Sequence, residues 1–378
     1  MAAVVLSVAI GLFELTQDLV RARLLAVTVM KATLTRAVAA LGLGAVVAVF
    51  SPTGFLLLLS SALAYVLAVL VQSRIAWRGT TLKFDAAGLS TVARQGLPLT
   101  LSLTLLAISS VTDRFMIANL VGSAEAGKYI AGLDLVRQTL MMPAMSAAAV
   151  FFPLAVKIYA SQGRTAVRSH LGECVELLLG ITLPACLGSA VISSHVANVI
   201  LGVDFREVAA LTMPIVAVAV IFQILTQQYL HASFLLSGRS SFYLINTASI
   251  IAANVILSYL FVSKYGTVGA AWARLGADIL GFICALILSR QAFPIPMPLG
   301  RLALTTIAGL IMALTVATID KGLHVSDPVA CLVLVGAGSA SYLAICWLLD
   351  ISHARRRVKV CLTFFRAKLA SIGTGSAA

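Results

Sequence analysis

The feature of this sequence that most constrains its fold is the recurrence of apolar stretches about 20 residues long. The hydrocarbon core of a bilayer is about 30 Å thick, and a helix needs about 20 apolar residues to cross it. Because a backbone in lipid must satisfy its own hydrogen bonds, and because the apolar runs are continuous, we expect α-helices rather than the alternating strands of a membrane barrel. The eleven candidate spans are residues 1–20, 28–50, 54–73, 97–121, 128–157, 171–193, 209–236, 242–262, 267–289, 301–319 and 329–349.

Composition supports a membrane location for the whole chain. Hydrophobic residues make up 60% of the 378 and charged residues only 11%, against about 25% charged residues in a typical soluble domain. A soluble fold of this size needs a polar surface that such a chain cannot supply. The net charge of +13 does not indicate a nucleic-acid partner, because basic residues of membrane proteins gather in cytoplasmic loops.

Several function classes lack their sequence signatures. The six cysteines are far apart and show no metal-ligand spacing, so we expect structural thiols and neither a metal nor another cofactor. No phosphate-binding loop of an ATP-driven motor occurs. The loops between spans are too short for a catalytic domain, so we predict that the protein is not an enzyme and has no catalytic residues.

The distribution of basic residues predicts the orientation. If the segment after the first span is cytoplasmic, eighteen Lys and Arg residues lie inside and four lie outside. Cytoplasmic loops of membrane proteins carry such an excess. We therefore predict a multi-pass protein of the bacterial inner membrane, with a cytoplasmic C-terminus.

A short internal repeat suggests the domain organisation. Residues 15–17 recur as residues 225–227, both Leu-Thr-Gln, and a matched order of spans and turns follows each copy. Internal repeats are common among secondary transporters. The match makes the first span the fourth helix of an N-terminally incomplete first lobe. The predicted parts are a partial first lobe (1–93), a second six-helix lobe (94–290), two additional spans (291–350) and a basic cytoplasmic tail (351–378).

Charged residues within the predicted spans are the first candidates for a functional site. They are Asp113, Arg114, Asp134, Arg137, Arg274 and Asp278. A charge at the centre of a membrane helix costs about 2.5–3.5 kcal/mol on insertion scales, so these side chains should face the bundle interior or a wet cavity. Asp134 and Arg137, and likewise Arg274 and Asp278, have the spacing of ion pairs within one helix. Structural pairing and cavity lining both remain open.

Two further polar faces point to the same interior. Span 209–236 carries Gln223, Gln227 and His231 at intervals of four residues, and the first span carries Glu14, Gln17, Asp18 and Arg21 on one helical face. We include Gln223, Gln227 and His231 among the substrate-binding candidates. No ligand partner lies at metal spacing from His231, so a metal role is not expected.

Several short motifs resemble one transporter family. They are Gln95-Gly96-Leu97-Pro98, Asp113-Arg114-Phe115-Met116-Ile117, Ala126-Gly127-Lys128-Tyr129 and the turn Tyr265-Gly266-Thr267-Val268-Gly269-Ala270-Ala271. Together they resemble the polysaccharide-biosynthesis branch of the multidrug/oligosaccharidyl-lipid/polysaccharide exporter superfamily, clearest between Arg94 and Arg290. The family's opening helices are not found.

The resemblance implies a function for the bundle. It implies two six-helix lobes that flip a lipid-diphosphate-linked oligosaccharide by alternating access, for exopolysaccharide or lipopolysaccharide assembly. Asp113 and Arg114 match the family's aspartate–basic pair, and cationic cavity residues would meet the diphosphate; Arg137 is a candidate from its depth alone. Membrane lipids, a polysaccharide polymerase and a co-polymerase are the other implied partners.

Three alternatives remain. A drug–cation antiporter of the same fold should have a more acidic cavity than one containing Arg114, Arg137 and Arg274. A glycosyltransferase, polymerase or ligase of the same pathway should carry a large loop or soluble domain. A non-transporting component of the polysaccharide assembly machinery would share all the features above.

Overall fold

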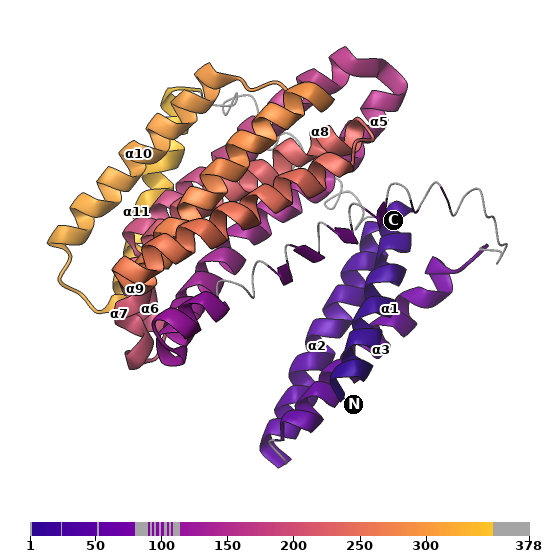
Figure 1. Cartoon of the computed structure of the whole chain (residues 1–378), viewed down its shortest axis with the longest axis horizontal. Helices are drawn as coiled ribbons and strands as arrows, with labels where there is room; N and C mark the ends of the chain where they lie inside the picture. Colours follow the sequence, from indigo (N-terminus) through magenta and orange to yellow (C-terminus); the bar gives the residue numbers. More distant parts are fainter. Residues whose placement is uncertain are drawn as a thin grey trace, which may run out of the picture. The chain divides into compact units, whose positions relative to one another are not determined.

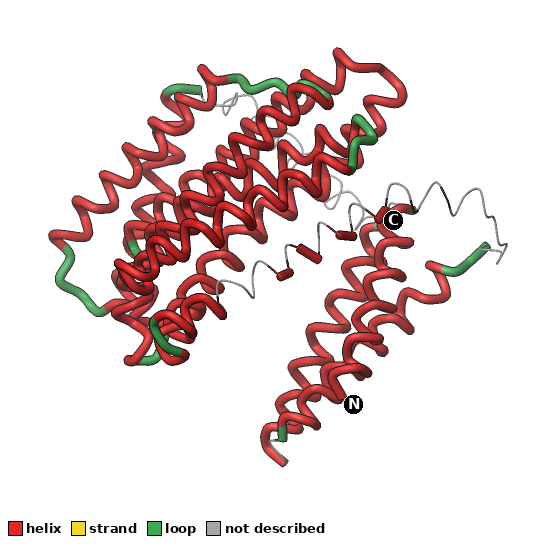
Figure 2. The backbone as a smooth tube through the Cα atoms, in the orientation of Figure 1, coloured by secondary structure: helices red, strands yellow, loops and turns green. Residues whose placement is uncertain are grey.

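The chain is helical throughout the part that its structure describes. The structure is a computed structural model, and it describes residues 2–23, 25–50, 53–79 and 114–350, with isolated residues between 90 and 108. Every regular element among these residues is a helix (Figures 1 and 2), which confirms the all-α prediction. The chain divides into two compact units, Met1–Ala86 and Ala87–Ala378.

The first unit is a bundle of three helices. They are α1 (Ala2–Ala22), α2 (Ala26–Phe50) and α3 (Gly54–Ala76). The buried ring of Phe13 meets Tyr65 of α3 edge to face, with 5.4 Å between ring centroids. At the end of α3, Arg23 donates through Nη1 to the carbonyl of Ile75 at 2.8 Å, where a helix leaves carbonyls unpaired. A ring contact and a cap therefore join α3 to the α1 end of the chain.

The second unit contains the remaining elements. It has a helical segment at 114–120, then α5 (Ser123–Val191), α6 (Ser193–Ile200), α7 (Val203–Ile224), the π-helix η1 (Leu225–Leu230), α8 (His231–Leu236), α9 (Ser241–Ala292), α10 (Leu299–Gly322) and α11 (Asp327–Leu348). α7, η1 and α8 follow one another directly.

Glycines break the two longest helices. α5 has 69 residues and α9 has 52, and at 1.5 Å per residue their lengths would be about 100 Å and 80 Å, far beyond the bilayer core. Gly163 in α5 has φ 81°, and Gly266 in α9 has φ 57°, a region that side chains with a Cβ rarely adopt. Each helix therefore consists of two segments, and the break at Gly266 confirms the turn predicted at 265–269.

The two segments of α9 form a tight antiparallel hairpin. A Cβ built on Gly281 would lie 2.3 Å from Cγ1 of Ile250, and one built on Gly276 would lie 2.9 Å from Cδ1 of Leu257. Gly276 faces Leu257, whereas Gly281, further along the second segment, faces Ile250, which is earlier in the first segment. The two segments therefore run in opposite directions. Small residues permit this approach, as they commonly do between membrane helices.

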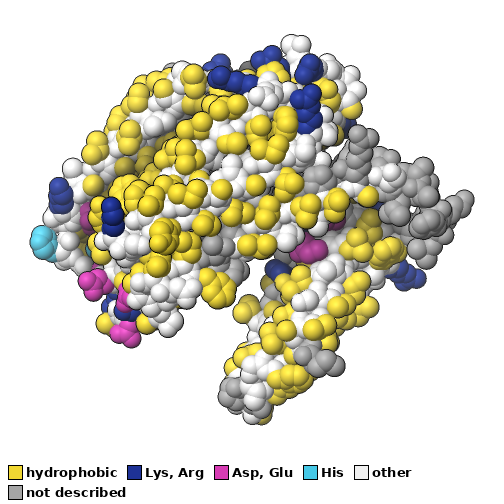
Figure 3. Space-filling view, in the orientation of Figure 1, with side chains coloured by type: hydrophobic (Ala, Val, Ile, Leu, Met, Phe, Trp, Pro, Cys, Tyr) yellow, Lys and Arg dark blue, Asp and Glu magenta, His cyan; other side chains and the backbone are white. Residues whose placement is uncertain are grey.

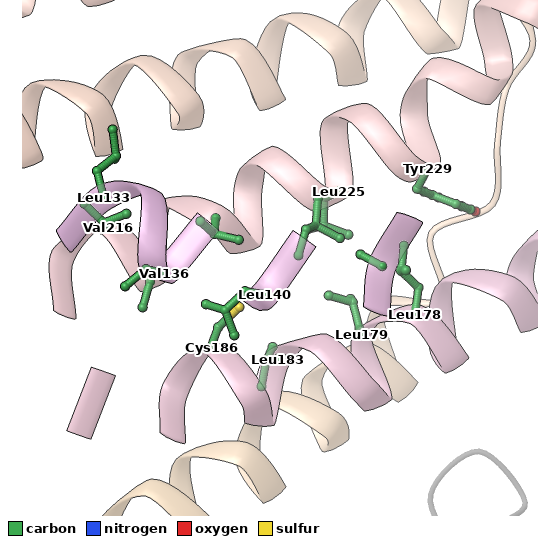
Figure 4. Close-up of a cluster of buried hydrophobic side chains, with 14 of the residues drawn as sticks. Leu133, Val136, Leu140, Leu178, Leu179, Leu183, Cys186, Val216, Leu225 and Tyr229 are labelled. Carbon is green, nitrogen blue, oxygen red and sulfur yellow. The ribbon is translucent and has the colours of Figure 1, made fainter. Parts of the chain in front are cut away.

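The core of the second unit lies between α5, α7 and α9. Figure 4 shows part of it, with side chains from both segments of α5 meeting α7 and η1. The labelled residues are Leu133, Val136, Leu140, Leu178, Leu179, Leu183, Cys186, Val216, Leu225 and Tyr229. α10 and α11 pack against the second segment of α5, where Tyr342 Oη donates to the carbonyl of Gly180 at 2.9 Å.

The outer surface is as apolar as the core. Large side chains such as Leu41 and Leu332 are 76% and 77% exposed, and hydrophobic side chains cover the visible faces of the helices (Figure 3). Among the described residues, eight helices are long and apolar enough to cross a membrane. Soluble proteins rarely expose apolar patches of this extent, so the chain is a multi-pass membrane protein.

The helices differ from the predicted spans mainly at their ends. The predicted loop between residues 157 and 171 is helical up to and beyond Gly163, because hydropathy marks where a helix leaves the lipid and not where its hydrogen bonds stop. Residues 109–113 of the predicted span 97–121, and several residues before them, lie outside the described residues. The count of eleven spans, and the lobe boundaries at 93 and 290, therefore stay predictions.

Candidate functional site

Two of the charged candidates, Arg114 and Asp134, form an ion pair between two helical segments. Arg114 Nη2 lies 3.2 Å from Oδ2 of Asp134 in α5. The spacing of Asp134 and Arg137 allowed a pair within one helix, and the structure joins Asp134 to the preceding helical segment. Asp113, the other half of the predicted Asp113–Arg114 pair, lies outside the described residues.

The depth and exposure of this pair point to a wet surface. Arg114 precedes the turn at Val121 by seven residues and Asp134 follows Ser123 by eleven, which places them roughly 10 Å and 16 Å along their helices. Their side chains are 49% and 41% exposed. Charges at this depth are costly against lipid, so the exposed sides of the pair should face water or a polar ligand.

Arg137 lies one turn further along α5. Its side chain is half-buried, and its Nε atom is fully buried. The three candidates Arg114, Asp134 and Arg137 are thus brought to one stretch of the second unit. The half-exposed guanidinium of Arg114 is available to an anionic ligand.

Arg274 and Asp278 form a separate, buried pair within α9. Arg274 Nε lies 3.0 Å from Oδ2 of Asp278, and the two side chains are 7% and 4% exposed. They share a buried stripe with Ala270, Ala277 and Gly281, the last of which packs against the other half of the hairpin. The ion pair that their spacing allows is present, and its burial is what a structural pair would show.

The π-helix separates the polar residues of span 209–236. Gln223 is buried at the end of α7, Gln227 is half-buried within η1, and His231 is buried at the start of α8. A π-turn is wider than an α-turn, so a spacing of four residues no longer keeps the three on one face. His231 Nε2 lies 2.9 Å from Oδ1 of Asn246, and Tyr243 packs against its ring, as expected for a core histidine.

In the first unit, the polar face of α1 that carries Glu14, Gln17, Asp18 and Arg21 is partly buried and partly exposed. Gln17 is buried and donates through Nε2 to Thr33 Oγ1 of α2 at 3.0 Å. Arg21 reaches Oε1 of Gln17 at 2.8 Å and Asp18 at 3.2 Å, while Asp18 and Glu14 are exposed. This polar face therefore contributes one buried polar contact to the bundle.

Sequence reasoning missed Arg36, a charge in the middle of α2. Its guanidinium carbon lies 5.7 Å from the ring centre of Phe13 and 5.3 Å from that of Tyr65, and Nη1 donates to Tyr65 Oη at 3.0 Å. Aromatic faces attract cations strongly once water is excluded. A lone Arg inside an apolar run was the available signal, but its ring partners lie on two other spans.

An apolar groove runs beside the charged stretch of α5. Its volume is about 560 Å³, within the range of small-molecule sites. Its lining comes from both segments of α5 and from α10 and α11: Thr139, Leu140, Pro143, Gly180, Ile181, Pro184, Ala185, Gly188, Ser189, Ile192, Met312, Val316, Leu334, Val335, Gly338, Ser339, Tyr342 and Leu343. Leu140 follows Arg137 by three residues, so the groove begins one helical turn from that arginine.

The two ends of the second unit differ in charge. Its basic end comprises the connections that carry Lys157, Arg164, Arg168, Arg239, Arg290 and Arg301. Its acidic end carries Glu125, Asp204, Glu207, Asp320 and Asp327, with Lys128, Arg206, Lys264 and Lys321 among them. In Figure 3, Lys and Arg gather along one edge of this unit, and Asp and Glu gather at the opposite end.

Comparison with known proteins agrees with this architecture. A solved structure of the lipid II flippase MurJ, in an inward closed conformation, matches with a TM-score of 0.69 and 14% sequence identity, over 90% of this chain and 71% of the MurJ chain. At that identity the likeness shows a shared fold. No curated protein matches the sequence. A family model described as polysaccharide biosynthesis protein matches residues 1–210, which is more than half of the 378 residues. The resemblance of the motifs is confirmed, and the chain belongs to this polysaccharide biosynthesis protein family.

Proposed function

We propose that this protein flips a lipid-linked saccharide across the membrane. The observation that carries the proposal is the half-exposed Arg114–Asp134 pair, set at membrane depth beside an apolar groove. A lipid-linked saccharide has an anionic phosphate linkage between a polar sugar and a long apolar tail. The family assignment and the fold shared with a lipid flippase support the same class of substrate.

Arg114 is suited to the phosphates of such a substrate. A guanidinium stays charged at any physiological pH and has five N–H donors in a planar fork that matches phosphate oxygens. The contact with Asp134 engages one nitrogen of Arg114, and about half of the side chain remains exposed. Asp134 would then hold the guanidinium in place while other donors bind the ligand, and Arg137 would add a second positive charge.

The apolar groove is suited to the tail. It is lined almost entirely by apolar side chains and small residues, and it starts one turn beyond Arg137. A tail lying in the groove would keep its hydrocarbon out of water while the phosphates remain near Arg114. Alternating access of the polar site to the two sides of the membrane would then move the saccharide, while the tail stays in an apolar environment.

The proposed orientation places the basic end in the cytoplasm of a bacterial cell. Cytoplasmic segments of inner-membrane proteins are enriched in Lys and Arg, and the basic end carries six of them. The acidic end would then face outward, and the C-terminal tail would be cytoplasmic. From the family resemblance we further propose that the transported saccharide is used in exopolysaccharide or lipopolysaccharide assembly. A polymerase and a co-polymerase would then be partners of the protein.

The main rival is a drug–cation antiporter of the same fold. An organic cation would meet the half-exposed guanidinium of Arg114 in this site. Like-charge contact in a partly desolvated site is unfavourable. The exposed guanidinium of Arg114 therefore favours an anionic substrate.

Ligand-induced stabilisation of the purified protein separates these two functions. We expect a polyisoprenyl diphosphate to raise the unfolding temperature, and an organic cation such as ethidium to leave it unchanged. Arg114→Gln should weaken diphosphate binding about 10- to 100-fold, because a hydrogen bond to a charged group contributes about 1.5–3 kcal/mol.

Two controls accompany this measurement. Arg206→Gln changes an arginine of the acidic end, which donates to the Leu201 carbonyl, and should bind the diphosphate as the wild type does. Ser339→Trp fills the groove and should weaken binding of the polyisoprenyl diphosphate. Leu332→Trp, on the exposed face of the same helix, should leave that binding unchanged. Stabilisation by the cation and none by the diphosphate would refute the proposal.

A further inference from the structure

A histidine at the acidic end of the second unit is held between two carboxylates. His195 lies in α6, the short helix between α5 and α7. Its Nδ1 is 2.6 Å from Oδ1 of Asp327, and its Nε2 is 2.7 Å from Oδ1 of Asp320. Asp320 is in the last turn of α10, and Asp327 is the first residue of α11. One imidazole therefore joins three helices.

The two contacts fix the protonation state of the ring. An ionised carboxylate only accepts hydrogen bonds, so both ring nitrogens must donate. Only the doubly protonated imidazolium has two N–H groups. Loss of either proton to solvent turns one nitrogen lone pair towards a carboxylate lone pair, and one of the two hydrogen bonds becomes a repulsive contact.

Two of the three helices that meet at His195, α10 and α11, are walls of the apolar groove, and the third, α6, directly follows the α5 wall. Ile192 lines the groove and immediately precedes α6. Val316 lines it one turn before Asp320, and Leu334 lines it two turns after Asp327. The histidine thus ties the α5, α10 and α11 walls together at the acidic end.

We propose that His195, Asp320 and Asp327 form a proton-dependent latch that holds the acidic end of the groove closed. The latch itself is a property of the second unit alone. Its consequence, control over how a lipid tail enters or leaves the groove, rests on the proposed function.

The charges around the histidine set the direction of the pH dependence. The hydrogen bond to Asp327, and after it the bond to Asp320, raises the pKa of His195 above its ordinary value of 6.5, against the opposing effect of desolvation. A group whose folded pKa is raised stabilises the structure fully below its unfolded pKa. The latch should therefore be closed at pH 6 and below, and should open as pH rises through the raised pKa.

The neighbouring elements leave this direction unchanged. From α7, Arg206 acts on Asp327, and Asn198 of α6 forms a hydrogen bond with Asp327. From α5, Lys128 is paired with Glu125 at 2.7 Å, and Asp204 and Glu207 of α7 act on that lysine. Lys321 follows Asp320 and is exposed, as is His324, whose Nδ1 lies 3.2 Å from the Gly322 carbonyl.

Hydrogen–deuterium exchange of the purified full chain tests the latch. Amide exchange in 190–203 and 320–330 would be followed between about pH 6 and pH 9 and corrected for intrinsic rates. In the wild type, the opening equilibrium should rise by up to about tenfold per pH unit between the ordinary pKa of 6.5 and the raised pKa of His195 and then level off, because opening releases one proton only in that range. Equal corrected protection at both ends of this range would overturn the proposal.

Matched variants identify the titrating group. His195→Gln should lower protection of both segments and abolish the pH dependence, whereas His195→Lys keeps a cation and should stay protected at high pH. His324→Gln changes an exposed histidine in the adjoining connection and should behave as the wild type. Wild-type pH dependence in His195→Gln would assign the change to another group and refute the latch. Confirmation of the latch without any transport activity would refute only the proposed function.

Discussion

The buried ion pair of α9 gives a prediction with a large expected effect. Arg274→Met removes the guanidinium 3.0 Å from Asp278, whose side chain is only 4% exposed. Removing one partner of a buried pair typically costs about 3–5 kcal/mol, because the remaining buried charge loses a hydrogen-bonded ion-pair partner. The partner is itself only 7% exposed, so solvent screening should reduce this value little. Arg274→Met and Asp278→Leu should each destabilise the protein by about this amount.

The double variant distinguishes a structural pair from two independent charges. Replacing both members of a buried pair by apolar residues of similar size is often neutral or stabilising. Arg274→Met/Asp278→Leu should therefore recover most of the loss, which gives a coupling free energy of about 3 kcal/mol or more.

The assay is equilibrium unfolding by SDS in mixed micelles, followed by circular dichroism. The matched control is the pair Arg21–Asp18 of α1, whose side chains are 55% and 68% exposed. The corresponding double-mutant cycle should give a coupling below about 1 kcal/mol. Losses that simply add in Arg274→Met/Asp278→Leu would refute the reasoning and reopen a cavity role for both residues.

Two other predictions concern packing and topology. Gly281→Ala places a Cβ 2.3 Å from Cγ1 of Ile250 and should destabilise the α9 hairpin by about 1–3 kcal/mol in the same unfolding assay. Adding Ile250→Ala should restore part of that loss. Equal stability of Gly281→Ala and the wild type would contradict the packing. For topology, a reporter fused after Arg78 or at the C-terminus should indicate the cytoplasm, and one at Ser123 or Ser326 the outside, because of the charge bias between loops. Opposite results at two or more of these four sites would reverse the proposed orientation.

The sequence predicted the membrane-spanning architecture because lipid leaves few alternatives. Apolar runs of sufficient length must be helical, and the eight long apolar helices among the described residues follow those runs. The break at Gly266 was also predictable, since the Tyr-Gly motif interrupts the apolar run there. The break at Gly163 was not, because polar residues on both sides remain helical and hydropathy carries no signal for them.

The candidate site was only partly predictable. The sequence identified Arg114 and Asp134 as charges in lipid-spanning segments, but the alternative spacing of Asp134 and Arg137 was equally acceptable, and only tertiary packing chose between them. Gln223, Gln227 and His231 were assigned to one helical face because a period of about 3.6 residues per turn was assumed. The π-helix η1 widens the turn between them and changes that period. His195 lies 125 and 132 residues from its two aspartates, so no local pattern could have joined them.

The central claim is that this protein moves a lipid-linked saccharide across the membrane. The most direct measurement is made in spheroplasts of the native host. A membrane-impermeant reagent labels the sugars of the lipid-linked saccharide only where they face outward, so labelling reports which leaflet holds the lipid. Deleting the gene should leave the lipid-linked saccharide protected on the cytoplasmic side, and the natural protein should restore labelling while its Arg114→Gln variant, present at equal abundance, should not. Unchanged labelling in the deletion strain, or full restoration by Arg114→Gln, would contradict the account.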